Sequence, residues 1–91
     1  MKIINESGNP RMSVLGERDL ETLEKFIQIV DKGLVLSSVD YDKGLICVGM
    51  TYNRGTSEEW VEEDFIVVNV ACDSVAAACK DVYSAAYARC M

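Results

Sequence analysis

Apolar residues recur along residues 17–32 at the spacing of one helix face. They stand three or four positions apart: Leu20, Leu23, Ile27 and Val30. Acidic residues crowd the start of this segment, where the positive end of a helix dipole favours them, and Gly33 suits the position after a helix C-terminus. We therefore predict a helix from Glu17 to Lys32. Phe26 and Ile29 widen its apolar stripe, so this helix is expected to contact more than one surface.

Three strands are predicted after this helix: Leu34–Tyr41, Leu45–Tyr52 and Phe65–Val70. A short turn joins the first two, and Gly44 tolerates the positive φ that such a turn requires. Gly49, in the middle of the second strand, marks a bulge or a close backbone approach. Residues 56–59 match a helix capping box. They predict either a single helical turn around Trp60 or a long hairpin in which Trp60 and Val61 already pair with the previous strand.

The last strand leads, without Pro or Gly, into an alanine-rich segment. This segment predicts a helix from Asp73 to Arg89, with Asp73 as its cap or first-turn acid. At about 100° per residue, one line of the helix carries small residues and one tyrosine: Cys72, Ala76, Cys79, Tyr83, Ala86 and Cys90. Ala and Cys let a helix lie close to a sheet, so this line is expected to face the strands.

The predicted order of helix, three strands and helix defines an α+β fold. It is a three-stranded antiparallel β-meander flanked by an N-terminal and a C-terminal helix, and it forms one domain over residues 17–91. Residues 1–16 form either an N-terminal arm or a short hairpin. Lys2–Ile4 and Arg11–Leu15 have strand composition and enclose the turn residues of segment 7–10.

The second and third predicted strands are apolar on both faces, which is unusual for a half-solvated antiparallel sheet. If both helices covered one face, the other face would expose an apolar patch larger than monomers usually tolerate. A two-fold dimer is the commonest way to cover such a face. We therefore predict a homodimer.

Composition and charge narrow the range of functions. The chain has 91 residues, of which 49% are hydrophobic, and a formal net charge of −6. Nucleic-acid binding requires a basic surface, so we expect no direct binding of nucleic acid; an acidic surface fits a basic protein partner or plain solubility. The sequence shows neither a signal-peptide core nor an apolar run that could span a bilayer. We expect a cytoplasmic protein that does not bind membranes.

The four cysteines could in principle form disulfides, bind a metal or act in catalysis. On the predicted last helix, Cys79 and Cys90 would lie about 16 Å apart along the axis, whereas a disulfide needs Cα atoms within roughly 7 Å. The chain contains no Cys-x-x-Cys motif and no histidine, so we expect free thiols, no metal and no cofactor. Cys72 stands at a predicted helix start, where thiol pKa values fall. A small enzyme that uses Cys72 is therefore an alternative function, although the usual histidine base is missing.

Five carboxylates surround the only tryptophan: Glu58, Glu59, Glu62, Glu63 and Asp64 around Trp60. Exposed neighbouring acids usually mark a solvated face or a blunted strand edge, and paired carboxylates catalyse acid–base reactions only in a cleft that separates their pKa values. Tryptophan, however, is a frequent anchor of protein interfaces. These six residues are therefore the candidate partner-binding site.

In element order and charge, the chain resembles some small phage-borne inhibitors, including certain anti-CRISPR proteins, although it shares no motif with them. The resemblance implies a protein that presents carboxylates where nucleic acid would sit. Our leading hypothesis is a non-catalytic interaction module that binds a basic protein, as an inhibitor or regulator of phage or mobile-element type. A structural subunit of a larger assembly is a further alternative.

Overall fold

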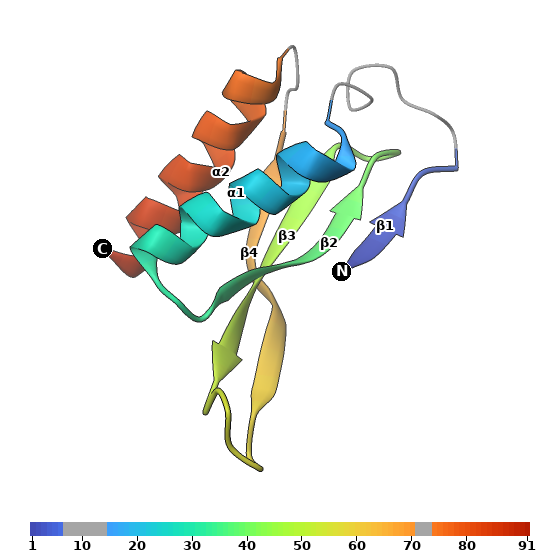
Figure 1. Ribbon diagram of the computed structural model, residues 1–91. Helices are drawn as coiled ribbons and strands as arrows, with labels where there is room; N and C mark the ends of the chain where they lie inside the picture. Colours follow the sequence, from blue (N-terminus) through green and yellow to red (C-terminus); the bar gives the residue numbers. More distant parts are fainter. Residues whose placement is uncertain (7–14, 71–73) are drawn as a thin grey trace.

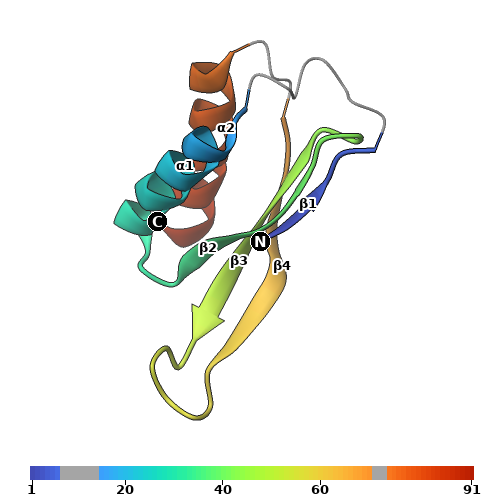
Figure 2. The ribbon, with the colours of Figure 1, turned by 45° about the vertical axis from the view of Figure 1, so that its right-hand side comes forward.

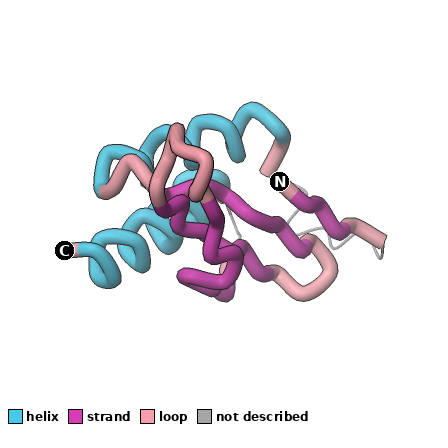
Figure 3. The backbone as a smooth tube through the Cα atoms, turned by 90° about the horizontal axis from the view of Figure 1, so that it is seen from below, coloured by secondary structure: helices cyan, strands magenta, loops and turns pink. Residues whose placement is uncertain are grey.

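The protein is an α+β structure with two layers. The computed structural model describes residues 1–6, 15–70 and 74–91, and within them the elements follow the order β1 (Lys2–Ile4), α1 (Glu17–Val30), β2 (Leu34–Asp40), β3 (Leu45–Tyr52), β4 (Trp60–Asn69) and α2 (Val75–Cys90) (Figure 1). The strands form one mixed sheet in the order β1-β2-β3-β4. Both helices lie on the same face of this sheet (Figure 2) and pack against each other (Figure 3). Neither described helix is long and apolar enough to cross a membrane.

β1 changes the predicted topology. It pairs in parallel with β2, with Lys2 opposite Ser38, and the amide of Tyr41 donates to the carbonyl of Ile4 at 2.7 Å. The sheet is therefore four-stranded and mixed, whereas the sequence predicted a three-stranded meander with a separate arm or hairpin. Turn residues after Ile4 favoured a local hairpin, but the strand instead pairs with the free edge of β2 across the α1 crossover. Most of the other predicted hairpin strand, residues 11–14, lies outside the described residues.

The predicted core face of α1 is confirmed, but its end is not. Leu20, Leu23 and Ile27 are buried, whereas the helix stops at Val30, two residues earlier than predicted. The backbone becomes extended at Asp31, whose carboxylate accepts the amide of Gly33 at 2.8 Å. Tight packing, rather than a positive φ, requires glycine at position 33. A Cβ there would lie 2.7 Å from the sulfur of Met50 and 2.9 Å from the carbonyl oxygen of Thr51.

β4 crosses the open face of β3 at Gly49. The register between these strands shifts after Val48, and a Cβ on Gly49 would lie 3.0 Å from Val61 Cγ1 and 3.2 Å from the carbonyl oxygen of Glu62. The Ser37 hydroxyl on β2 lies at the same crossing, 2.6 Å from the carbonyl oxygen of Glu63 and 3.0 Å from that of Cys47. β2 and β4, which are not neighbours in the sheet, therefore meet over β3. This confirms the close approach predicted at Gly49.

Beyond this crossing, β3 and β4 continue as a hairpin arm, defined here as residues 51–64. Tyr52 pairs with Trp60 and Thr51 with Val61, so the long-hairpin alternative is correct and β4 begins five residues before the predicted strand start at Phe65. The arm extends past the end of the helical layer (Figure 1) and lengthens the molecule to 40 × 26 × 20 Å.

The core face of α2 is rotated relative to the prediction. Ala86, which was on the predicted line, is buried together with Ala78 and Val82, whereas Tyr83, which was also predicted to face the strands, is 36% exposed. Close packing of α2 against both α1 and the sheet selects Ala and Val, and the larger tyrosine ring turns outward. Ser74 is the N-cap, and its hydroxyl accepts the amide of Ala77 at 3.1 Å. The helix thus begins after the predicted Asp73, which, like Cys72, lies outside the described residues.

We predict that Gly33→Ser lowers the free energy of unfolding by about 1–3 kcal/mol, because the added side chain overpacks the contact with Met50 and the Thr51 carbonyl. Gly16→Ser is the matched control. A Cβ at Gly16 finds only an ordinary contact at 3.5 Å, and serine suits an N-cap, so its effect should stay within about 0.5 kcal/mol. Chemical denaturation measures both variants. Equal stabilities of the two variants would contradict the close approach at Gly33.

Candidate functional site

All six predicted binding residues lie on the hairpin arm and are exposed. Trp60 is the central apolar group, with 53% of its surface exposed. It stacks on Tyr52, the residue opposite it on β3, with ring centroids 4.5 Å apart and planes inclined by 23°. Such cross-strand aromatic pairs stabilise a two-stranded hairpin. The stack gives the arm a fixed aromatic surface that faces solvent.

Glu62 belongs to the same face of the arm as this stack. It follows Trp60 by two residues, the period that returns a strand side chain to one face, and its Oε2 atom accepts the hydroxyl of Tyr52 at 2.9 Å. This hydrogen bond and the negative charge of Glu62 raise the pKa of Tyr52 above its ordinary value. The structure therefore brings Trp60 and Glu62 together, with Tyr52 as a third member that the sequence analysis missed. The long-hairpin register contained the signal, since it sets Tyr52 opposite Trp60.

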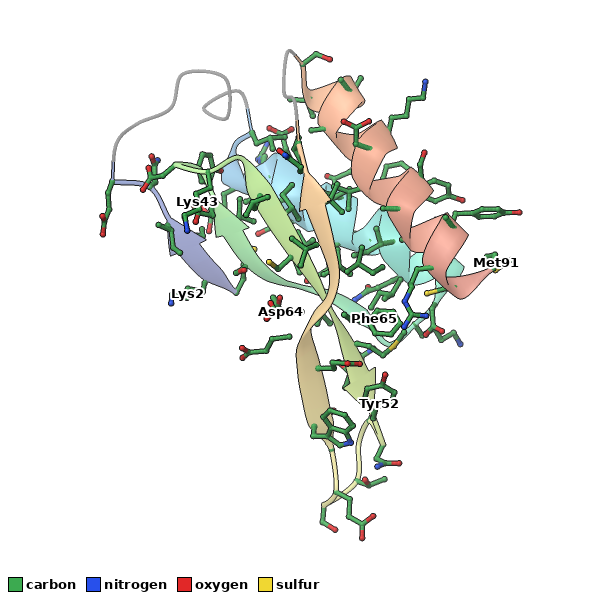
Figure 4. The ribbon with its side chains drawn as sticks, turned by 180° about the vertical axis from the view of Figure 1, so that it is seen from behind. Lys2, Lys43, Tyr52, Asp64, Phe65 and Met91 are labelled. Atoms are coloured by element: carbon green, nitrogen blue, oxygen red, sulfur yellow. The ribbon has the colours of Figure 1, made fainter. Side chains whose placement is uncertain are left out.

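Glu63 and Asp64 lie apart from this face, where β4 crosses β3. They line a hollow of about 240 Å³ on the open face of the sheet, together with Lys2, Ser37 and Ser38. Figure 4, viewed from behind, shows Asp64 and Lys2 on this side and Tyr52 on the arm. Trp60 and Glu62 on one side and Glu63 and Asp64 on the other therefore do not form one continuous site.

The remaining two acids, Glu58 and Glu59, lie at the tip of the arm. The Thr56 hydroxyl donates to the Asn53 carbonyl at 2.7 Å and accepts the amide of Glu58 at 3.2 Å, while the Glu59 carboxylate accepts the amide of Gly55 at 3.4 Å. The capping-box residues thus stabilise the loop of a hairpin, and the alternative of a helical turn around Trp60 is wrong. The same side-chain-to-backbone hydrogen bonds serve turns as readily as helix starts.

The arm is tied to the body of the protein at two places. Near the tip, the guanidinium of Arg54 donates to the carbonyl of Lys32 at 2.7 Å, and Lys32 lies two residues after the end of α1. At the base, Ser37 contacts the carbonyl of Glu63. Both contacts limit hinge motion of the arm, so the aromatic stack and its acids keep their position relative to the helices.

The arm lacks the features of a catalytic or metal centre. Its carboxylates are exposed to solvent, whereas acid–base catalysis needs a buried pair whose pKa values differ. Across the described residues, no three His, Cys, Asp or Glu side chains converge as metal ligands would. An exposed aromatic group flanked by acids can instead make apolar contact and attract positive charge.

Three described cysteines, Cys47, Cys79 and Cys90, are free thiols. Burial raises the pKa of Cys79, with a smaller effect from the charge of Asp19. Burial also raises the pKa of Cys90, to which Asp31 adds. A raised pKa reduces the thiolate fraction at neutral pH, so these two thiols are poor nucleophiles. Cys72 lies outside the described residues, and its predicted role stays a prediction.

A second exposed apolar surface lies between the two helices. A groove of about 350 Å³ is lined by Phe26, Ile29, Cys79, Lys80 and Tyr83. Phe26 and Ile29 widened the apolar stripe of the first helix in the sequence, but the groove itself was missed because Tyr83 was assigned to the sheet-facing side of α2.

In comparisons with protein-family models, curated proteins and solved structures, the chain matches none.

We predict that Glu62→Gln lowers the pKa of Tyr52 towards its ordinary value, because the amide keeps a hydrogen-bond acceptor but removes the negative charge that opposes the phenolate. Since the folded-state pKa is raised, the Tyr52–Glu62 contact stabilises the fold below the unfolded pKa of tyrosine and is lost as pH rises through the folded value. Ultraviolet titration of the phenolate, with Tyr52→Phe to assign the transition, measures this shift. Glu59→Gln is the control and should leave the transition unchanged; an identical Tyr52 transition in Glu62→Gln and wild type would contradict the assignment.

Proposed function

We propose that this protein is a non-catalytic interaction module that binds a basic protein partner in the cytoplasm through its hairpin arm. One observation carries the proposal: the arm extends beyond the helical layer and presents an exposed Tyr52–Trp60 stack next to exposed carboxylates. Such an arm suits a docking role because it reaches a partner before the body of the molecule does.

The two kinds of group on the arm act at different stages of binding. Carboxylates attract a basic surface over distances of about a Debye length and raise the association rate. The indole of Trp60, which is half exposed in the free protein, then supplies apolar area that contact removes from water. Because Tyr52 already holds the indole in place, binding orders few additional side chains.

Charge attraction by the carboxylates and apolar contact by Trp60 together define how the protein acts on its partner. A protein that covers a basic surface on its partner blocks any acidic ligand of that surface, and it thereby acts as an inhibitor or regulator. The proposed activity requires no cofactor and no bond-making step, so it depends only on how long the arm stays bound.

The test is affinity capture from cells with wild-type protein and a charge-neutralised arm, Glu58→Gln/Glu59→Gln/Glu62→Gln/Glu63→Gln. We expect the neutralised arm to lose the captured partner, or to hold it at least tenfold more weakly, because steering and rim contacts are removed. Trp60→Ala should weaken capture to a similar degree through its apolar contact. Wild-type capture should also fall as salt rises.

The matched control removes the same number of charges elsewhere: Glu6→Gln/Glu17→Gln/Glu21→Gln/Asp81→Asn, all at exposed positions. This control should capture the partner as wild type does. If both charge variants lose the partner equally, net charge rather than the arm governs binding; if neither loses it, the arm is not the binding site.

A further inference from the structure

The groove between α1 and α2 is the largest concentration of exposed apolar side chains on the helical layer. Phe26 is 47% exposed, Ile29 73% and Tyr83 36%. The surface continues along α2 through Tyr87, whose ring stacks on Tyr83 with centroids 6.4 Å apart and which is 51% exposed. Large contiguous apolar patches on soluble proteins usually mark an interaction surface.

Basic residues stand in and beside this groove, although the chain as a whole is acidic. Lys80 lines the groove. Lys25, one helical turn before Ile29, and Arg18, two turns before Lys25, are exposed along the same side of α1. Two acids lie nearby: Asp19, whose charge influences Cys79 and whose carboxylate already accepts the amide of Gly16 at 2.8 Å, and Glu21, which is exposed one helical turn before Lys25. No described residue that lines the groove is acidic.

The hairpin arm has the complementary composition. It carries an exposed aromatic side chain next to exposed acids, whereas the groove carries exposed apolar side chains next to exposed bases. A groove of about 350 Å³ falls within the range of about 300–1,000 Å³ typical of sites that enclose a ligand group. Among the described residues, Trp60 is the exposed aromatic group that stands beside the acids.

We infer that a second copy of this chain occupies the groove, with Trp60 of its arm inserted between α1 and α2 and its acids near Lys25 and Lys80. This inference rests on the proposed binding role of the arm and gives the arm a second partner, another copy of this chain, besides the basic protein. The contact joins two different surfaces, so two copies either exchange arms reciprocally about a two-fold axis, or copies add head to tail into a ring or a filament.

This contact differs from the dimer predicted from the sequence, which would cover the open face of the sheet. The homodimer stays a prediction, but the apolar strand residues on which it was based are placed differently from expectation. Ile46, Val48 and Met50 face the helices and are buried, whereas on the open face Leu45 and Cys47 are half-buried and Val67, opposite Cys47 on β4, is 54% exposed. The helical layer exposes larger apolar side chains than the open face does: Phe26, Ile29, Tyr83 and Tyr87.

The test uses sedimentation velocity of the whole chain from about 1 to 200 µM at low and high salt, a range that brackets typical weak protein association. We expect wild type to exceed the 10.1 kDa of one chain as concentration rises, and to dissociate as salt rises. An arm variant, Glu58→Lys/Trp60→Ala, and a groove variant, Ile29→Glu/Lys80→Glu, should each remain monomeric. All four substituted residues are exposed, and circular dichroism verifies that both variants fold.

Mixing the two variants gives the decisive measurement. The arm variant retains an intact groove and the groove variant an intact arm, so an equimolar mixture should form a 1:1 complex although neither variant associates alone. A symmetric contact between identical surfaces would not be restored in this way. A wild type that stays monomeric throughout, variants that associate as wild type does, or a mixture that remains monomeric would each overturn the inference.

The outcomes also separate this inference from the proposed function. If the wild type is monomeric but capture of a cellular partner depends on the acids of the arm, self-association is wrong and the proposed function stands. If the arm variant changes neither self-association nor capture, the arm has no binding role and both proposals fail.

Discussion

The crossing of β4 over β3 at Gly49 is the constraint on which the rest of the structure depends. A Cβ on Gly49 would be tight against Val61 and the Glu62 carbonyl, so glycine favours this close approach to the β3 backbone. The approach brings β4 within reach of the Ser37 hydroxyl on β2, so three strands are joined at one point. Below this point the two strands of the arm leave the helical layer, and above it the sheet curves under α1 and α2 (Figure 1). The glycine thus divides the molecule into a packed half and a projecting half.

The sequence predicted best those features that local periodicity determines. The core face of α1, the bounds of β3 and the turn at Gly44, where φ is +70°, depend on neighbours within a few positions. β4 was predicted too short because Glu62, Glu63 and Asp64 interrupt its apolar pattern; these acids are exposed on an edge strand, where charge is tolerated and discourages further pairing. The pairing of β1 with β2 and the rotation of α2 depend on contacts between distant segments, which no local pattern describes.

The candidate site, too, was predicted where local sequence determines it and was missed where contacts between distant segments do. Composition identified Trp60 and the acids around it, because an isolated tryptophan in an acidic segment is conspicuous. It did not reveal that Glu63 and Asp64 lie apart from Trp60, where the β3–β4 register shifts next to Gly49. Nor did net charge reveal the bases on the helical layer. A chain with charge −6 can present basic residues on one surface when its acids are concentrated on others.

β1 is held to the rest of the protein less firmly than the core elements are. It consists of three residues, lies at the edge of the sheet, and is joined to β2 by parallel pairing, while the Glu6 amide donates to the Asp42 carboxylate at 3.0 Å. β1 does not extend as far along β2 as Leu36. There the Glu24 carboxylate on α1 accepts the amide of Leu36 at 2.8 Å, so a side chain, in place of a strand, provides the hydrogen-bond acceptor. Short edge strands open at a small fraction of the free energy of global unfolding. Detachment of β1 would therefore cost less than global unfolding, and it would leave the edge of β2 open to pairing with a different strand while the helices and the hairpin arm stay folded.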